Sequence, residues 1–278
     1  MPGVLFVVGT PIGNLGDITR RAVDTLAVVD RIVAEDTRRT RSLLAHLGIK
    51  GKPIECVEAH TAYSRVVKVV ESLNEGNSIA LVTDAGMPGI SDPGARLVAA
   101  AVEAGVTVQV VPGPSAVTAA LALSGLVEGP FYFFGFLPRQ GKRRQAAIRR
   151  IVNSADAVVI FESPQRIAAT LRELAQFAPT RPAVICRELT KIHEEVRRGP
   201  LAALSDDIGE TRGEFVLVLG AQNLDEQSEP DTVTIADALL SEKLEQGLSP
   251  RTILDELGVS GQQRRELYSR LLTLAEKD

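Results

Sequence analysis

Residues 79–94 read Ile-Ala-Leu-Val-Thr-Asp-Ala-Gly-Met-Pro-Gly-Ile-Ser-Asp-Pro-Gly, and the rest of the chain can be arranged around them. The stretch begins with a short apolar run that has no helical period, which is typical of a buried strand. A loop rich in glycine and proline follows, and then a helix that Ser91 or Asp92 could cap and whose first turn suits Pro93. This order places Asp84 at the carboxyl end of a strand, where open α/β sheets bind their ligands.

The same unit of strand, loop and helix recurs on both sides of this stretch. Strands are expected at residues 4–8, 31–34, 54–57, 79–82 and 106–111. Each is followed by a loop of turn residues and then by a segment with helical periodicity. Such an alternation predicts parallel strands with helices on both faces of the sheet. The loops that carry glycine, aspartate or serine therefore fall on one edge of the sheet.

A second α/β unit is expected after residues 124–130, which contain two glycines and a proline. Its strands are expected at residues 131–136, 157–161, 183–186 and 215–219, and its helices at 142–152, 165–176 and 201–204. Residues 221–231 carry acidic residues and no basic one, which is typical of a solvated linker. The short helices expected at 233–245, 250–257 and 262–274 resemble a helix-turn-helix, with a small helical cap as the alternative. The sequence therefore predicts an α/β protein with domains at 1–125 and 126–221 and a C-terminal helical unit at 222–278.

The composition indicates a globular protein without a bound metal. Of its 278 residues 45% are hydrophobic, which is enough for real cores. Cys56 and Cys186 lie far apart and the three histidines are scattered, so neither a disulfide framework nor a metal site is expected. Residues 104–127 are uncharged, but Pro112 and Pro114 interrupt them, so no membrane span is expected. We expect a soluble cytoplasmic protein.

Several common site motifs are absent from the sequence. It contains no G-x-G-x-x-G, no G-x-x-x-x-G-K-[ST] and no G-x-S-x-G pattern, so dinucleotide-binding, P-loop and α/β-hydrolase interpretations lose their support. What remains is a set of Gly/Pro loops and a strand-end Asp84, without a nucleophile beside a histidine. Such an edge suits a compact cofactor that is held by backbone groups and a carboxylate.

A segment of the second unit is basic although the chain has a net charge of −4. No acidic residue occurs at 129–155, and the basic residues there follow a group of phenylalanines. The segment predicts either a phosphate-binding surface or a solvated helix face. The last expected helix also has a basic edge. The candidates for phosphate contact are Arg139, Lys142, Arg143, Arg144, Arg264 and Arg265.

The motifs together resemble a known family. They are Val-Gly-Thr-Pro-Ile-Gly-Asn-Leu-Gly-Asp-Ile-Thr at 8–19, Ala-Glu-Asp-Thr-Arg at 34–38, residues 82–94 of the opening stretch, Val-Pro-Gly-Pro-Ser-Ala at 111–116, Gly-Phe-Leu-Pro-Arg at 135–139, Phe-Glu-Ser-Pro at 161–164 and Arg-Glu-Leu-Thr-Lys-Ile-His-Glu-Glu at 187–195. In this order they resemble the ribosomal RNA small subunit methyltransferase I family, which belongs to the tetrapyrrole-methylase superfamily. The resemblance extends from residue 7 to about residue 220, and the tail resembles the family's helix-turn-helix.

The resemblance implies a fold, a reaction and partners. It implies a homodimer with the two-domain α/β fold of the class III methyltransferases, which binds S-adenosylmethionine between the domains. It also implies transfer of the methyl group to the ribose 2′-hydroxyl of a cytidine in the decoding region of 16S rRNA. The substrate is then either free 16S rRNA or an assembled small ribosomal subunit.

Site residues follow from matching the motifs position by position. The residues expected to border the cofactor are Gly9, Thr10, Pro11, Asp84, Gly86, Met87, Ser115, Ala116, Phe161 and Val216. A general base is expected to assist the neutral hydroxyl, because such groups contribute about 10²–10⁴-fold in rate. The candidates at strand ends are Glu35, Asp36, Lys191 and Glu194, and neither motif nor spacing chooses among them. An RNA substrate would make the basic candidates RNA-binding residues.

Two other functions fit the sequence. One is a methylase of the same superfamily that acts on a small molecule such as a tetrapyrrole. The basic segment and the tail oppose it, as does Thr83-Asp84-Ala85, which stands where many tetrapyrrole methylases have Gly-Asp-Pro. The other is a non-catalytic RNA-binding assembly factor, which the intact Gly/Pro loops oppose.

Overall fold

The computed structural model describes residues 3–57, 63–222, 237–257 and 261–275. Tertiary contacts group the chain into two compact units, residues 1–222 and 223–278. The first unit contains two sheets, and the predicted domain boundary at residue 125 stays a prediction. No helix in the described part of the chain is long and apolar enough to cross a membrane.

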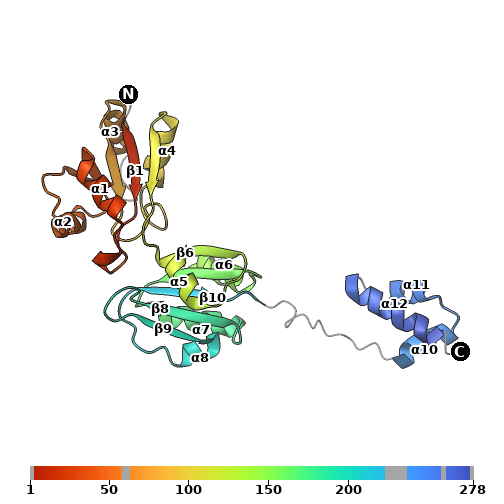
Figure 1. Cartoon of the computed structure of the whole chain (residues 1–278). Coiled ribbons are helices and arrows are strands. Elements are labelled where there is room, and N and C mark those ends of the chain that lie inside the picture. Colours follow the sequence, from red (N-terminus) through yellow and green to blue (C-terminus); the bar gives the residue numbers. More distant parts are fainter. Residues whose placement is uncertain (1–2, 58–62, 223–236, 258–260, 276–278) are drawn as a thin grey trace. The chain divides into compact units, whose positions relative to one another are not determined.

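The first sheet is entirely parallel (Figure 1). Its strands are β1 (Val4–Val8), β2 (Arg31–Ala34), β3 (Ile54–Cys56), β4 (Ile79–Val82) and β5 (Thr107–Val111), in the order β3-β2-β4-β1-β5. The apolar residues of β4 are all buried, as expected for an inner strand of a parallel sheet. Because the order reverses around β1 and β4, the loops after these strands meet at one edge, where open α/β folds bind ligands.

Helices cover both faces of this sheet. On one face, α3 (Tyr63–Asn74) and α4 (Ala95–Glu103) share a core with the strands. On the other face, α1 (Arg20–Val28) and α2 (Thr37–His46) do so. A short 3-10 turn, η1 (Leu15–Asp17), precedes α1.

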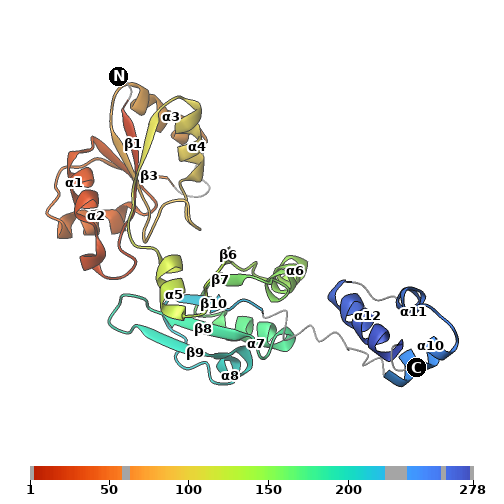
Figure 2. The ribbon, with the colours of Figure 1, turned by 45° about the vertical axis from the view of Figure 1, so that its right-hand side comes forward.

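The second sheet is mixed. It consists of β6 (Phe131–Phe136), β7 (Ala157–Glu162), β8 (Pro182–Arg187), β9 (Glu195–Pro200) and β10 (Phe215–Leu219), in the order β6-β7-β10-β8-β9. Strands β6 and β7 are parallel, and the other pairs are antiparallel. One face packs on α6 (Gly141–Val152), α7 (Ile167–Phe177) and α8 (Leu201–Asp206). The other face packs on α5 (Ala116–Ser124), which lies against β10 and β8 (Figure 2).

Strand β9 was not predicted from the sequence. It is an edge strand that pairs only with β8, and its residues are exposed or half-buried. Its sequence, Glu-Val-Arg-Arg-Gly-Pro, therefore lacks the apolar alternation that marks a strand with a buried face. The other strands of both sheets lie within a residue or two of their predicted positions, and the α/β fold class is confirmed.

The predicted cap of α4 was wrong. The helix begins at Ala95 with Gly94 as its N-cap, and no side chain donates or accepts a capping hydrogen bond there. Gly94 has a φ of 128°, a conformation that favours glycine. Neither Ser91 nor Asp92 is therefore held at the helix end.

The C-terminal unit is a small helical core. Helices α10 (Asp237–Glu245), α11 (Pro250–Glu256) and α12 (Gly261–Ala275) pack around Leu240, Ile253, Leu254, Leu267 and Leu271. Residues 223–231 of the predicted linker and 233–236 of the first predicted tail helix lie outside the described residues.

A buried arginine joins the turn before β8 to its surroundings. Arg181 is 2% exposed, and its guanidinium donates hydrogen bonds to the carbonyl oxygens of Gly220 (2.8 Å), Ile151 (2.8 Å) and Asp156 (2.9 Å). Burial lowers its pKa to about 10, so it stays protonated at neutral pH. The carbonyl dipoles thus replace the water that this cation loses on folding.

We predict that Arg181→Met lowers the free energy of unfolding by roughly 2–4 kcal/mol, because the carbonyl oxygens lose their charged donor while remaining buried. Urea denaturation followed by circular dichroism measures this change. The exposed Arg172 on α7 provides a control, and Arg172→Met should change stability by less than about 0.5 kcal/mol. Equal effects of the two substitutions would contradict the role of Arg181.

Candidate functional site

The loops after β1, β4 and β5 lock together at the edge of the first sheet. Thr10 and Gly86 exchange two backbone hydrogen bonds, of 2.9 and 3.1 Å, and the Thr10 hydroxyl donates to the carbonyl of Thr83 at 3.1 Å. Gly9 and Gly113 meet so closely that a Cβ on Gly9 would lie 2.7 Å from backbone atoms of Gly113. The loops therefore form one rigid surface.

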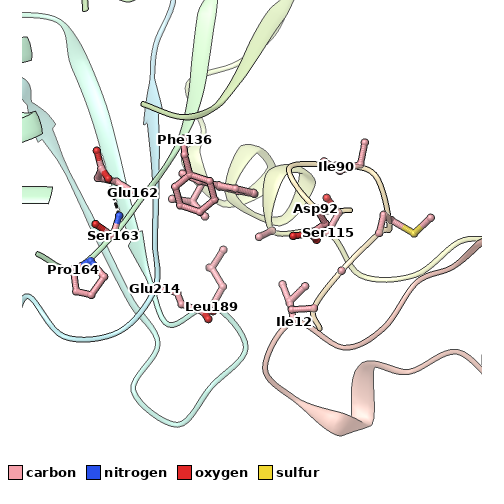
Figure 3. Close-up of a pocket in the computed structure, with 16 residues that line it drawn as sticks. Ile12, Ile90, Asp92, Ser115, Phe136, Glu162, Ser163, Pro164, Leu189 and Glu214 are labelled. Atoms are coloured by element: carbon pink, nitrogen blue, oxygen red, sulfur yellow. Dashed lines mark hydrogen bonds between the residues drawn. The ribbon is translucent and has the colours of Figure 1, made fainter. Parts of the chain in front are cut away.

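This surface forms one wall of a pocket of about 340 Å³, a size within the usual range of small-molecule sites. Figure 3 shows Ile12, Ile90, Asp92 and Ser115 on this wall and Phe136, Glu162 and Leu189 on the opposite one. The complete lining consists of Ile12, Ala85, Gly86, Met87, Ile90, Asp92, Ser115, Ala116, Phe136, Phe161, Glu162, Ser163, Pro164, Leu189, Glu214 and Val216. Both sheets of the first unit therefore contribute to one site.

The pocket includes only part of the predicted cofactor set. Gly86, Met87, Ser115, Ala116, Phe161 and Val216 line it. Gly9, Thr10, Pro11 and Asp84 do not. Thr10 is 1% exposed and Gly9 is packed against Gly113, so these residues hold the loops that line the pocket.

Aromatic and aliphatic side chains make most of the opposite wall. The ring of Phe161 contacts those of Phe133 and Phe136 edge to face, with centroids 5.0 and 5.6 Å apart. Leu189 and Val216 extend this apolar surface. Such a wall suits a flat heterocycle, whose polar edge the backbone groups of a glycine loop can bind.

Asp84 does not line the pocket but connects the loop after β4 to neighbouring residues. Its Oδ1 accepts a hydrogen bond from the backbone N–H of Asp36 at 3.1 Å, and its Oδ2 lies 3.4 Å from the Nε of Arg39. Burial and the negative charge of Glu35 raise its pKa, while Arg39 opposes the rise. Asp84 thereby ties the loop after β4 to the start of α2.

None of the candidate general bases lines the pocket. Glu35 accepts a hydrogen bond from the Thr83 hydroxyl at 2.7 Å. Asp36 caps α2, and the hydrogen bonds from the Arg38 side chain and backbone lower its pKa to about 2. A carboxyl group with so low a pKa is a weak base.

The two candidates in the turn between β8 and β9 are also engaged elsewhere. Lys191 lies 2.8 Å from a carboxylate oxygen of Glu188 and 3.1 Å from one of Glu214. Burial alone would lower its pKa, but these hydrogen bonds outweigh it and raise the pKa, so the amine is protonated at neutral pH. Glu194 accepts a hydrogen bond from the backbone N–H of Thr190 at 2.6 Å.

Asp92 is a pocket residue that the sequence interpretation missed. It was considered only as a helix cap, although it belongs to the same motif as Gly86 and Met87. Its carboxyl group lines the pocket, and burial raises its pKa to about 6. The nearby Thr83 hydroxyl opposes this rise, and the negative charges of Glu35 and Asp84 add to it.

The basic candidates of α6 separate into two groups. Arg139, Lys142 and Arg143 are exposed at the start of the helix. Arg144 is buried instead, and its guanidinium contacts Glu173 at 2.9 Å and Thr170 at 2.9 Å. The sequence pattern did not indicate this burial, and we leave Arg144 out of the proposed RNA surface.

The basic edge of α12 is partly described. Arg264 forms an ion pair with Asp255 of α11, with an N–O distance of 2.7 Å. The side chain of Arg265 lies outside the described part of the structure. No group of three or more His, Cys, Asp or Glu side chains within the described residues is arranged to hold a metal ion.

Comparison with known proteins identifies the class of this fold and site. The family model of tetrapyrrole (corrin/porphyrin) methylases matches residues 4–205. Among solved structures, a uroporphyrin-III-C-methyltransferase from Thermus thermophilus is 21% identical with a TM-score of 0.57, over 78% of this chain and 94% of that one. A diphthine synthase is 16% identical with a TM-score of 0.60, over 81% of this chain and 93% of that one. These structures share the fold, which is that of the class III methyltransferases.

Relatives with similar sequences show to which family of tetrapyrrole methylases the chain belongs. The ribosomal RNA small subunit methyltransferase I of Xylella fastidiosa is 42% identical over 96% of this chain and 98% of its own length. The protein of that name from Thermotoga maritima is 44% identical over 79% of this chain and 99% of its own length. Within the tetrapyrrole methylases, the chain belongs to the ribosomal RNA small subunit methyltransferase I family. It is therefore a methyltransferase, and its methyl donor is S-adenosylmethionine.

The pocket fits this donor. The apolar wall around Phe161 and Val216 suits the adenine ring, and the backbone of residues 85–87 and 115–116 offers polar groups beside it. The carboxyl group of Asp92 adds a negative charge to the pocket lining, which suits a donor that carries a positive charge.

We predict that Gly9→Ala weakens S-adenosylmethionine binding by roughly tenfold or more. The new methyl group would clash with the Gly113 backbone and with the Met87 sulfur, each 2.7 Å away, and overpacking of this kind costs about 1–3 kcal/mol. Calorimetric titration measures the affinity. Gly129→Ala is a matched control, because its Cβ meets nothing within 4 Å. Unchanged affinity in Gly9→Ala would show that the loops tolerate separation.

Proposed function

We propose that the protein transfers a methyl group from S-adenosylmethionine to the ribose 2′-hydroxyl of a cytidine in the decoding region of 16S rRNA. The main support is the agreement with ribosomal RNA small subunit methyltransferase I relatives over nearly the whole chain. The pocket adds to it, because it has an apolar wall for a nucleoside and a rigid wall of loop backbone. The likeness to uroporphyrin enzymes concerns the fold alone.

The residues of the chain contribute chiefly by positioning. When bound, S-adenosylmethionine supplies a methyl group that is already activated by its positive sulfur. The locked loops after β1, β4 and β5 hold one side of the pocket fixed, and the Phe161 ring is wedged between its aromatic neighbours on the other. Good orientation of two reacting groups can lower a reaction barrier by about 7–11 kcal/mol, so this rigidity would favour the reaction.

Methyl transfer from labelled S-adenosylmethionine tests the function. Small ribosomal subunits, free 16S rRNA and uroporphyrinogen III are offered in parallel, and the modified nucleotide is located by mass spectrometry. We expect label on the ribose of a cytidine in the RNA of one or both ribosomal substrates. Label on uroporphyrinogen would support a small-molecule methylase, and no label with intact RNA binding would support an assembly factor.

The exposed start of α6 is the proposed RNA surface of the second sheet. Arg139, Lys142 and Arg143 carry three positive charges there, and no acidic residue occurs between 129 and 155. Arg264 and Arg265 of the C-terminal unit are proposed to recruit RNA as well. Arg264 also forms an ion pair with Asp255. Each phosphate contact would release a counterion from the RNA, which makes binding dependent on salt.

We predict that Lys142→Ala combined with Arg143→Ala weakens RNA binding at low salt. The slope of log affinity against log salt should flatten by about 1.4, since each phosphate contact to a single strand contributes about 0.7. Filter binding over a range of salt concentrations measures it. The pair Arg20→Ala and Arg41→Ala removes the same charge from exposed positions of the first sheet's helices and should leave the slope unchanged. Equal slopes for both double variants would contradict the proposed surface.

A homodimer and a cytoplasmic location are parts of the same proposal. Small subunit rRNA is the partner that the relatives' names state for those proteins. A protein that modifies it would work where ribosomal subunits are, in the cytoplasm. Sedimentation equilibrium of the full chain tests the dimer, for which a mass of twice 29.7 kDa is expected.

A further inference from the structure

Asp92 lies in the pocket, and its carboxylate is near the Thr83 hydroxyl, which also donates a hydrogen bond to Glu35 at 2.7 Å. The helix that follows it is capped by Gly94 without any side-chain hydrogen bond. No ion pair to Asp92 exists among the described residues. In Figure 3 its side chain lies on the loop wall with Ser115, opposite the wall that carries Phe136 and Leu189.

The other carboxylates of the pocket are committed. Glu162 has a fully buried side chain, lies 2.6 Å from Arg166 and accepts hydrogen bonds from the Thr170 hydroxyl at 2.7 Å and the Ser163 backbone at 2.8 Å. Glu214 forms an ion pair with Lys191 at 3.1 Å. Both carboxylates therefore already have partners within the protein.

We infer that Asp92 is the general base that takes the proton from the acceptor hydroxyl. This inference rests on the proposed function, since it needs a neutral hydroxyl as acceptor. The O–H bond breaks and its proton goes to the Asp92 carboxylate, while the oxygen's electron pair forms the bond to the methyl carbon. The carbon–sulfur bond breaks with its electron pair on sulfur, so the positive charge of the donor is neutralised.

The surroundings of Asp92 suit this role. Burial raises its pKa to about 6, and the Thr83 hydroxyl lowers it in part. The negative charges of Glu35 and Asp84 further raise the pKa of Asp92. Arg39 lies beside Asp84 and acts to lower the pKa of that carboxyl group. A base whose pKa lies just below the working pH is mostly ionised and still basic enough to take a proton.

Charges on the remaining sides do not neutralise Asp92. The second sheet presents Glu162 and Glu214 to the pocket, and each has its own cation, Arg166 and Lys191. Asp36 on α2 is paired with Arg38. Since no Lys, Arg or His of the described residues lines the pocket, a bound ligand would supply any positive charge beside Asp92 there.

The test compares Asp92→Asn with wild type in methyl transfer to small subunits. We expect kcat to fall by about 10²–10⁴-fold, with an unchanged melting temperature and unchanged S-adenosylhomocysteine affinity by calorimetry. In wild type, kcat/KM for the donor should fall tenfold per pH unit below about pH 6, because protonated Asp92 is no base, and this dependence should vanish in Asp92→Asn. Asp24→Asn on the exposed side of α1 is the matched control and should behave as wild type.

A second measurement does not depend on turnover. A sulfonium bound beside Asp92 lowers the pKa of its carboxyl, so S-adenosylmethionine binding at pH 6 should release protons. Calorimetry in two buffers with different ionisation enthalpies counts them, and Asp92→Asn should release fewer.

The outcomes separate the two proposals. Wild-type protein that methylates no RNA would contradict the proposed function. If wild type methylates small subunits and Asp92→Asn does so equally fast, only the role of Asp92 is contradicted. The same holds if kcat/KM of Asp92→Asn falls at low pH as it does in wild type. Unchanged proton release in Asp92→Asn would also count against Asp92 as the titrating group of the pocket.

Discussion

The structure depends on the close approach of two loops, where Gly9 after β1 meets Gly113 after β5. A side chain on either residue would force these loops apart, and with them the Thr10–Gly86 bridge that fixes the loop after β4. Glycine is required here for the absence of Cβ, since φ is not positive at either position. The pocket wall inherits its rigidity from this contact, although Gly9 itself does not line the pocket.

The sequence predicted what depends on local pattern. Strand ends placed Gly86 and Ser115 at the pocket because parallel strands bring their carboxyl ends to one edge. It could not predict Asp92, because an acidic residue before a helix has the same pattern whether it caps the helix or faces a ligand. It could not predict the burial of Arg144 either, since the partner Glu173 is distant in sequence and lies on another helix. Edge strand β9 was not predicted because its sequence has no apolar face.

Buried charge is handled in two ways in this protein. Arg181 and Glu162 are surrounded by enough hydrogen-bond partners to replace water, and such groups are structural. Asp92 is only partly desolvated and forms no ion pair with a described residue, so the cost of its charge appears as a raised pKa. The same physical quantity, the free energy of removing a charge from water, thus distinguishes residues that hold the fold from Asp92, the residue that we propose as the base.

Helix α5 connects the two halves of the pocket mechanically. Its first residue, Ala116, lines the pocket together with Ser115, while Val117 and Ala120 are packed in one core with the residues of β8 and β10. The helix follows the last strand of the first sheet in the sequence, but it packs against the second sheet. A change in the spacing of the two sheets would therefore displace Ser115 and Ala116 relative to the loops of the first sheet, and so change the width of the pocket.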